Sequence, residues 1–273
     1  MPTVNLLDIL TMRTVVVTGS ASGMGAATKD RLEAGGQRVI GVDLRNADVV
    51  ADLGTVEGRQ ATIASVEEIA DGTIDGLVTW AGLPGLTGRP GSLVVSVNYF
   101  GTIALIEGLR PLLASGERPA AVAISSNSTT CQPGVPMDVV TRCLAGDERA
   151  ARDAADAAGS LATYPATKTA IAWWVRRHAP TAEWAGAGIT LNAVAPGAVE
   201  TPLLQASRDD PAIGEMIDAF PVPVGRKGTA DELAAVVAFL LGPDARFFCG
   251  SVVFVDGGTD AHLRADDFPM PMS

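Results

Sequence analysis

The sequence has few of the residues that form disulfide frameworks or metal sites. It contains three cysteines, Cys131, Cys143 and Cys249, with no C-x-x-C spacing between them. An odd number of isolated cysteines suits reduced thiols, so we expect a cytoplasmic protein without disulfides or a zinc site. Cys249 stands among apolar residues, where we expect it to pack. The two histidines, His178 and His262, have no carboxylates at ligand spacing, so we predict no metal site.

Basic residues and long apolar runs are also scarce. Twenty lysines and arginines stand against 31 aspartates and glutamates, which gives a net charge of −11 and a pI near 4.6. A field of that sign repels nucleic acids and anionic membranes, so we expect neither as a partner. No apolar stretch reaches the roughly 20 residues that span a bilayer. Met1 to Thr11 lack a basic region before an apolar run, so we expect a leader or a small edge element there, not a signal peptide.

The chain does contain enough apolar residues for one large domain. Hydrophobic residues make up 47% of the 273 positions, which favours a single α/β domain over two small ones. Short apolar runs alternate with helical patterns, as in a parallel sheet that helices cover on both faces. The predicted strands span residues 13–18, 38–42, 49–53, 75–80, 119–125, 189–194 and 251–255. We therefore predict one domain over residues 1–273, with a doubly wound α/β fold and a seven-stranded parallel sheet.

The helices between these strands have recognisable ends. Capping boxes and glycines mark most of them. We predict helices over 26–34, from a capping box at 65–68 towards 70, over 92–114, 137–145 and 147–158, from Tyr164 through Trp184, and from a capping box at 229–232 to Gly242. Residues 129–159 interrupt the alternation of strand and helix as a helical insertion. Its second helix, framed by Asp147 and Gly159, has little apolar face, so we expect a surface or interface element.

A glycine-rich turn connects the first predicted strand to the first helix. Gly19 permits a tight turn, Gly23 lets the backbone approach a pyrophosphate, and Gly25 lets helix and strand pack closely. The free N–H groups and the dipole at the start of the helix attract an anion. Because the turn follows a strand and opens a helix, it predicts a dinucleotide site in which Ser22 and Met24 also contact the cofactor.

The second strand ends at Asp43, which decides between the two nicotinamide dinucleotides. An acid at this position can hydrogen-bond both ribose hydroxyls and repels a 2′-phosphate, so we predict NAD. Ser22 in place of a basic residue supports this choice, whereas Arg45 can meet a phosphate and keeps NADP as the less favoured cofactor. Further predicted cofactor contacts stand at or after strand ends: Leu44, Asp52, Leu53, Ala81, Gly82, Pro196, Gly197, Val199 and Thr201.

Tyr164 and Lys168 lie four positions apart in a segment with helical spacing. That spacing places the ammonium near the phenol on one helix face. A nearby cation lowers the pKa of a tyrosine from its usual value of about 10, which would make it a proton carrier near neutral pH. The spacing is common by itself, and a solvated lysine beside a half-buried tyrosine is the alternative interpretation.

Two further segments carry candidate substrate contacts. Ser125 to Ser128 follow the fifth predicted strand, at the sheet edge where open α/β folds place their sites. Residues 198–228 form a lobe whose apolar side chains can line a pocket for an apolar substrate or pack on one another. These side chains are Leu203, Leu204, Met216, Ile217 and Phe220. Asn98, inside the apolar helix over 92–114, is either a hydrogen-bonded core amide or the site of a bulge.

In combination these motifs resemble the short-chain dehydrogenase/reductase family from Arg13 to Gly258. The resemblance rests on Thr18-Gly19-x-x-x-Gly23-x-Gly25, Asp43, Ala81-Gly82, Asn98, Ser126, Tyr164-x-x-x-Lys168 and Pro196-Gly197. It implies a Rossmann-type fold and an NAD(H)-dependent enzyme that interconverts alcohols and ketones. In such an enzyme Tyr164 would be the general acid/base, Lys168 would lower its pKa and hold the nicotinamide ribose, Ser126 would orient the substrate oxygen, and Asn98 would anchor a water.

Three departures from the family pattern leave alternatives open. Trp80 stands where the family usually has an asparagine. Pro165 follows the tyrosine and cannot donate a backbone hydrogen bond, which only the first turn of a helix tolerates. The interval between Ser126 and Tyr164 is longer than usual, so Ser125 or Ser128 can be the working hydroxyl instead. We choose Ser126, the second serine after the last apolar residue of the strand.

The resemblance leaves the substrate and the assembly as expectations. A bulky apolar substrate such as a steroid is favoured, with an aromatic alcohol or a dihydrodiol as the alternative. A protein of another class, a non-catalytic NAD-binding sensor, has no need of both Tyr164 and Lys168. The resemblance implies that the insertion occupies a surface that other family members use in tetramers, which suggests a homodimer, with a tetramer as the second possibility.

Overall fold

Seven parallel strands form the centre of the structure, a computed structural model that describes residues 12–268. Their order across the sheet is β3-β2-β1-β4-β5-β6-β7. The strands are β1 Thr14–Thr18, β2 Arg38–Asp43, β3 Val49–Val50, β4 Gly76–Thr79, β5 Ala120–Ile124, β6 Thr190–Pro196 and β7 Val252–Val255. The predicted seven-stranded doubly wound fold is therefore confirmed. The expectation for Met1 to Thr11 lies outside the described residues.

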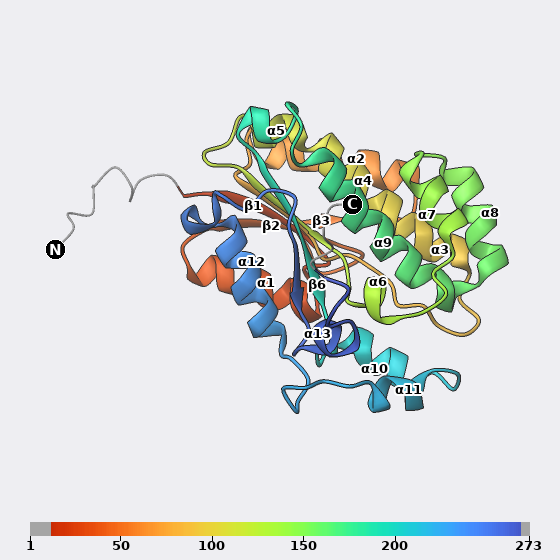
Figure 1. The fold of residues 1–273 in the computed structure, drawn as a ribbon. Helices are drawn as coiled ribbons and strands as arrows, with labels where there is room; N and C mark the ends of the chain where they lie inside the picture. The colour runs from red at the N-terminus through yellow and green to blue at the C-terminus, as the bar shows by residue number, and fades with distance from the viewer. Residues whose placement is uncertain (1–11, 269–273) are drawn as a thin grey trace.

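Helices cover both faces of the sheet (Figure 1). On one face α1 Gly23–Ala34 and α12 Ala230–Leu241 pack on each other and on the inner strands. On the other face lie α2 Val56–Ile69, α4 Thr102–Gly108 and α9 Ser160–His178. The inner strands β1, β4, β5 and β6 are buried throughout, because both of their faces meet apolar helix surfaces.

The strand order reverses beside β1, and this reversal positions the site. β1 pairs with β2 on one side and with β4 on the other, so the chain leaves their carboxyl ends in opposite directions. A crevice forms at such a switch point in open α/β sheets. The glycine-rich turn after β1 and the loop after β4 therefore border the same opening.

Two predicted boundaries near the edge of the sheet were wrong. β3 ends at Val50 rather than at residue 53. Helix α2 begins at Val56, where the Thr55 side chain accepts a hydrogen bond from the Gly58 N–H, so Thr55 is the N-cap. Ser65, expected to start this helix, lies inside it, because the earlier cap already satisfies the first turn.

The predicted helix over 92–114 is interrupted. It divides into α3 Gly91–Val95, a π-helical turn over 96–101, α4 and α5 Arg110–Ala114. Pro111 has no N–H to continue the ladder after α4, which explains the break there. Among the described helices, the span Gly91–Gly108 has the length and apolar composition of a membrane segment, but 72% of it is buried inside the protein. That burial is typical of a core helix.

The Tyr164 helix is shorter than predicted. α9 ends at His178, and Pro180 follows soon after, since a helix rarely continues into a proline. Trp184 is therefore outside the helix. It packs edge-on against Trp174 with ring centroids 5.9 Å apart and is buried.

The insertion forms α6 Ser128–Cys131, α7 Met137–Leu144 and α8 Glu148–Ala158. Asp147 caps α8 and Gly159 ends it with φ +81°, both as predicted. The expectation that α8 is a surface or interface element was wrong in part: its charged face is exposed, but Ala151 and Ala155 are fully buried in the core. A Cβ at Gly91 would lie 2.1 Å from the Ala155 carbonyl oxygen, so small residues let α8 and α3 pack closely.

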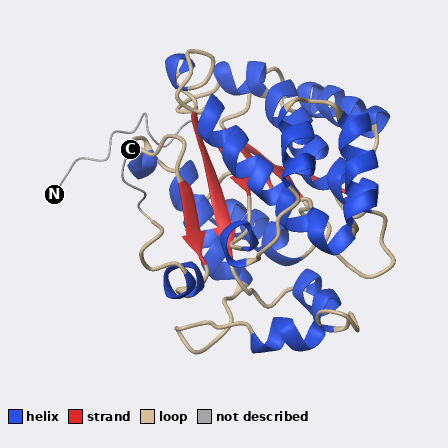
Figure 2. Ribbon diagram, turned by 45° about the vertical axis from the view of Figure 1, so that its right-hand side comes forward, coloured by secondary structure: helices blue, strands red, loops and turns tan. Residues whose placement is uncertain are grey.

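The lobe over 198–228 and the last described helix follow the carboxyl ends of β6 and β7. The lobe over 198–228 contains α10 Pro202–Arg208 and α11 Gly214–Ala219 and stands off from the main body (Figures 1 and 2). Short turns over 185–187 and 243–245 and α13 Thr259–Leu263 complete the described chain. The three cysteines are unpaired, as expected, but Cys249 is exposed rather than packed. Its thiol hydrogen-bonds to the Ala179 carbonyl.

Candidate active site

The glycine-rich turn has the geometry of an anion cradle. Gly19 has φ +68°, and a Cβ there would lie 2.8 Å from the Ala81 nitrogen. A Cβ at Gly25 would lie 2.0 Å from the Gly19 carbonyl oxygen, so a side chain does not fit. Ser22, the N-cap of α1, makes no side-chain capping bond, and the first turn carries no acid. The N–H groups of Gly19, Ser20 and Ala21 already donate to Val42 and Asp43, so the N–H groups at the start of α1 are the ones available to a phosphate.

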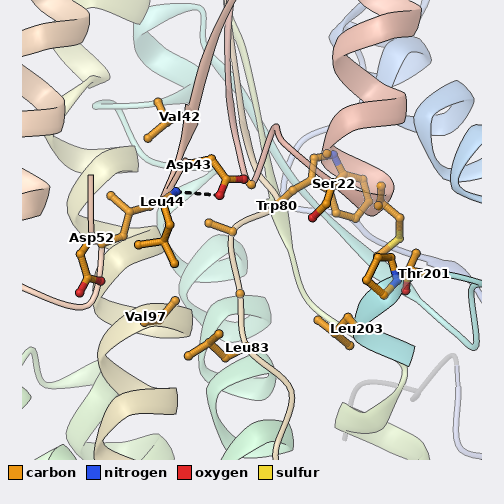
Figure 3. Close-up of a pocket in the computed structure, with 18 of the residues that line it drawn as sticks. Ser22, Val42, Asp43, Leu44, Asp52, Trp80, Leu83, Val97, Thr201 and Leu203 are labelled. Carbon is orange, nitrogen blue, oxygen red and sulfur yellow. Dashed lines mark hydrogen bonds between the residues drawn. The ribbon is translucent and has the colours of Figure 1, made fainter. Parts of the chain in front are cut away.

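Asp43 borders the cavity that opens beside this turn (Figure 3). Its Oδ2 accepts a hydrogen bond from the Ala21 N–H (3.0 Å), and its Oδ1 accepts one from the Leu44 N–H (2.7 Å). These two donors fix the carboxylate at the end of β2. In Figure 3, Asp43 and Asp52 lie on one side of the cavity and Thr201 lies on the other.

The cavity beside the glycine turn has a volume of about 400 Å³ and continues into a smaller one of about 70 Å³. Met24, Trp80, Gly82, Thr201 and Leu203 line both, so the two form one cleft. Every predicted cofactor contact lies on this cleft. The larger part holds Gly19, Ser22, Gly23, Gly25, Asp43, Leu44, Asp52, Leu53 and Ala81, and the smaller part holds Tyr164, Lys168, Pro196, Gly197 and Val199.

Lys168 lies next to Tyr164 on one face of α9. Its Nζ is 5.8 Å from the centroid of the tyrosine ring and donates a hydrogen bond to the Ile124 carbonyl (2.9 Å). The side chain is buried, and burial lowers the pKa of Lys168 to about 8. The predicted closeness of the two groups is therefore confirmed.

The expected direction of the pKa shift of Tyr164 was wrong for the protein on its own. Burial raises the pKa of the phenol, and a hydrogen bond with the Ser126 side chain acts in the opposite direction. Lys168 does not lower it, because its ammonium is directed at the Ile124 carbonyl. Poor solvation of the phenolate in the cleft wall outweighs the effect of the Ser126 hydrogen bond.

Ser126 is the serine of its segment that faces Tyr164. Ser125 is turned away, since its hydroxyl donates to the Lys168 carbonyl (2.9 Å). The Ser126 Oγ accepts a hydrogen bond from the Ser128 N–H (3.1 Å), which leaves its proton free for another acceptor. Ser128 lines only a third cavity, described below. The geometry thus supports the choice of Ser126 among the three.

Asn98 fits both interpretations that the sequence left open, a hydrogen-bonded core amide and the site of a bulge. It lies in the π-helical turn and is fully buried. Its Oδ1 accepts from the Leu83 N–H (2.7 Å), and its Nδ2 donates to the Leu83 carbonyl (2.9 Å). The side chain therefore fixes the loop after β4 beside the cleft. A π-turn is frequent at functional sites, while the water expected at Asn98 stays a prediction.

Trp80 and Pro165, which depart from the family pattern, differ in their hydrogen bonding. Trp80 donates its indole N–H to the Thr28 hydroxyl (2.9 Å), so it joins the end of β4 to α1. Pro165 is the sixth residue of α9, inside the helix rather than in its first turn. The Leu161 carbonyl therefore receives no N–H from four residues ahead, and the helix keeps this gap beside Tyr164.

A third cavity of about 260 Å³ begins at Ser126 and Tyr164. The five apolar lobe residues predicted to line a pocket all do so: Leu203, Leu204, Met216, Ile217 and Phe220. Sequence reasoning missed the contributions of other segments, which are Pro84, Gly85, Cys131, Gln132, Pro133, Leu161 and Ile213. The loop after β4 and the insertion carry no local pattern that places them here. No cluster of metal ligands occurs in the described part of the chain.

Comparison with known proteins finds relatives over nearly the whole chain. A family profile described as enoyl-(acyl carrier protein) reductase matches residues 149–260. The chain is 43% identical to 3-alpha-hydroxysteroid dehydrogenase/carbonyl reductase of Comamonas testosteroni, over 94% of this chain and 100% of that protein. It is 33% identical to coniferyl-alcohol dehydrogenase of Pseudomonas sp. (strain HR199 / DSM 7063), over 91% of this chain and 97% of that protein.

A solved structure is also similar. It is the 3-alpha-hydroxysteroid dehydrogenase from Pseudomonas sp. B-0831 complexed with NADH, with a TM-score of 0.90 and 48% identity. The match covers 93% of this chain and 100% of that one. The shared fold therefore includes the sheet, the cleft and the insertion region.

Proposed function

The chain belongs to the short-chain dehydrogenase/reductase family, and from that premise we propose that it interconverts a secondary alcohol and a ketone on a bulky, apolar, steroid-like substrate with NAD(H). Its relatives are dehydrogenases and reductases, and the protein is an enzyme that acts on CH–OH groups. The observation that carries the proposal is the meeting of the dinucleotide-sized cleft and the apolar third cavity at Tyr164 and Ser126.

The cleft fits a nicotinamide dinucleotide. The glycine turn leaves no room for a side chain at Gly25, and the uncapped N–H groups at the start of α1 suit a pyrophosphate. The fixed Asp43 carboxylate can accept hydrogen bonds from ribose hydroxyls and repels a 2′-phosphate. NADH in the similar hydroxysteroid dehydrogenase supports the same choice here.

The proposed chemistry is a coupled hydride and proton transfer. The bound cofactor supplies or accepts the hydride at its nicotinamide ring. Tyr164 gives a proton to the ketone oxygen in reduction and takes it from the alcohol in oxidation. Ser126, held by the Ser128 N–H, donates a second hydrogen bond to the same oxygen, where negative charge develops. Lys168, which lines the same part of the cleft as Tyr164, would hold the nicotinamide ribose.

The third cavity supports an apolar substrate. Leu203 and Leu204 from α10, Met216 and Ile217 from α11, and Phe220 just after α11 line it together with Ser126. A volume of about 260 Å³ that opens to solvent suits a multi-ring molecule with part of its surface outside. The names of the two hydroxysteroid dehydrogenases make a steroid the first substrate to test.

The test is a substrate screen with purified protein. NADH formation is followed with steroid, terpenoid, aromatic and dihydrodiol alcohols, and Tyr164→Phe is assayed in parallel. We expect turnover of a 3-hydroxysteroid, loss of activity by several orders of magnitude in Tyr164→Phe, and retained NADH binding by fluorescence. Preference for an aromatic alcohol or a dihydrodiol would correct the substrate. Equal activity of Tyr164→Phe and wild type would remove the proposed mechanism.

We also propose that the protein is a homodimer. β7 is the edge strand of the sheet, and all four of its residues are only half-buried. Close to it in sequence, Phe247 is fully exposed, and Phe239 on α12 is 45% exposed. An open apolar strand edge is a ready pairing surface. The packing of the insertion against α3 and α9 supports a dimer over a tetramer.

A further inference from the structure

One carboxylate fastens the lobe over residues 198–228 across the third cavity. Asp210 lies between α10 and α11 and is 7% exposed. Its Oδ2 accepts a hydrogen bond from the Thr87 N–H (2.6 Å), and its Oδ1 accepts one from the Thr87 hydroxyl (2.9 Å). Thr87 belongs to the loop between β4 and α3. Within residues 12–268, the hydrogen bonds that cross from the lobe to this loop both end on Asp210.

The Asp210 carboxylate is well satisfied in this position. Its Oδ1 also accepts from the Ala212 N–H (2.9 Å), so it receives three donors in all. Hydrogen bonds to an ionised acceptor are about twice as strong as neutral ones. The Thr87 N–H is the largest of the causes that hold the pKa of Asp210 below its usual value. The carboxylate is therefore ionised throughout the neutral range.

The loop that receives the lobe is itself anchored to the helices of the active site. Leu83 is held through its N–H and its carbonyl by Asn98. The Leu86 N–H donates to the hydroxyl of Ser160 (3.1 Å), the first residue of α9. The loop that carries Thr87 is thus hydrogen-bonded to α9, the helix that carries Tyr164.

The lobe is braced internally. Arg208 on α10 pairs with Asp218 on α11 (2.8 Å), and Lys227 pairs with the same carboxylate (2.9 Å). At the base of the lobe, Val199 forms a bridge with Gly228. The lobe is therefore held at its base by the Val199–Gly228 bridge and internally by the ion pairs of Asp218. Asp210 attaches the side of the lobe that reaches over the cavity.

We propose that Asp210 is a positioning residue that holds the lobe closed over a bulky substrate, an inference that rests on the proposed function. The two hydrogen bonds between Asp210 and Thr87 form what we call the latch. With the latch closed, Met216, Ile217 and Phe220 cover the cavity that ends at Tyr164 and Ser126. The closed lobe then holds the substrate close to Tyr164 and Ser126 and excludes water from the cavity. A small ketone that does not reach the lobe gains nothing from this contact.

The kinetic test separates this role from general damage. Asp210→Ala and Thr87→Val each remove part of the latch, while Thr87→Ser keeps both donors. Asp209→Ala is the matched control, because Asp209 is the neighbouring acid and bonds only to Gln205 through its side chain. For Asp210→Ala we expect the KM for a steroid ketone to rise on the order of tenfold, with kcat changed less and with unchanged KM for cyclohexanone. Thr87→Ser should behave as wild type.

A second measurement does not depend on turnover. Arg208, Arg226 and Lys227 are trypsin sites within the lobe. Cleavage is followed after Arg226 and Lys227, because substitution of Asp209 itself changes the site at Arg208, and Arg226 is largely exposed. Opening of the latch should raise the rate of cleavage there on the order of tenfold in Asp210→Ala, and Asp209→Ala should match wild type. Equal cleavage rates and equal KM for the steroid ketone in both variants would overturn the latch. If wild type turns over no ketone, the proposed function fails while the cleavage rates still decide whether the latch exists.

Discussion

Tyr164 and Lys168 share a wall of the cleft, and burial acts on them in opposite directions. It raises the pKa of the phenol and lowers that of the ammonium to about 8. Both shifts favour the neutral forms, because the cleft solvates charge poorly. The acid form of Tyr164 is therefore the resting state, which suits ketone reduction at neutral pH.

The pH profile should report this state. Oxidation needs the deprotonated phenol, so its rate should rise with pH into the alkaline range. Reduction needs the protonated phenol, so its rate should fall there. Ser126→Ala removes the hydrogen bond that lowers the pKa, so its residual profiles should move to higher pH. Ser128→Ala keeps the backbone N–H that holds Ser126 and should leave the midpoint in place. A shift to lower pH in Ser126→Ala would contradict this account.

Asp43 is the residue that should set the choice between NAD and NADP. Asp43→Ala removes the acceptor for the ribose hydroxyls and the charge that repels a 2′-phosphate. We expect the ratio of kcat/KM for NAD over NADP to fall on the order of tenfold or more, the effect of one charge-assisted hydrogen bond. Adding Arg45→Ala should cancel any gain with NADP, if Arg45 meets the phosphate. An unchanged ratio in Asp43→Ala would show that another group makes the choice.

An ion pair joins α8 of the insertion to α2, which packs on the central sheet. Nη1 and Nη2 of Arg59 on α2 each donate a hydrogen bond to Glu148 on α8 at 2.7 Å. Arg59 also donates to the carbonyls of Leu53 (2.8 Å) and Ser96 (3.1 Å), next to the cleft and at the start of the π-turn. The insertion is thus connected to the adenosine end of the site.

Glu148→Gln should lower stability in a pH-dependent way. Burial alone would raise the pKa of Glu148, but hydrogen bonds and the charge of Arg59 outweigh it and lower the pKa. A carboxyl with a lowered folded-state pKa contributes stability above its unfolded value of about 4.3, and this is lost as pH falls through the folded value.

We expect Glu148→Gln to lower the unfolding free energy by about 1–3 kcal/mol at pH 7, with a smaller difference in acid. Denaturant titrations at both pH values provide the measurement. Glu33→Gln, which breaks an exposed pair with Lys29, is the control and should cost no more than about 0.5 kcal/mol. Equal losses in the two variants would mean that the Arg59–Glu148 pair is no stronger than a surface pair.

At the scale of the whole molecule, the edge at β7 should determine assembly. Phe247→Asp places a charge on the fully exposed apolar side chain beside this edge. Light scattering after size exclusion should show a dimer for wild type, and a dissociation constant raised on the order of a hundredfold in the variant. Val56→Asp, on α2 beyond the opposite edge, should remain dimeric. A wild-type monomer or tetramer would refute the homodimer.

Features that depend on neighbours along the chain could be predicted from the amino-acid sequence. Glycines at 19, 23 and 25, an acid ending β2, and the spacing of Tyr164 and Lys168 each act within one turn or one strand end. Their chemistry follows from local backbone geometry, so the fold, the cleft and its lining could be predicted. The cytoplasmic location, inferred from cysteine usage and from the expected lack of a signal peptide, stays a prediction.

Contacts between segments that are distant in the sequence depend on tertiary packing and became visible only in the structure. Asp210 meets Thr87 across 123 residues, and Arg59 meets Glu148 across 89. The sign of the pKa shift of Tyr164 likewise depends on how closely the cleft surrounds it. No local pattern encodes these contacts, because many packings are compatible with the same helices. Which one forms depends on the sum of burial and hydrogen bonding over the whole core.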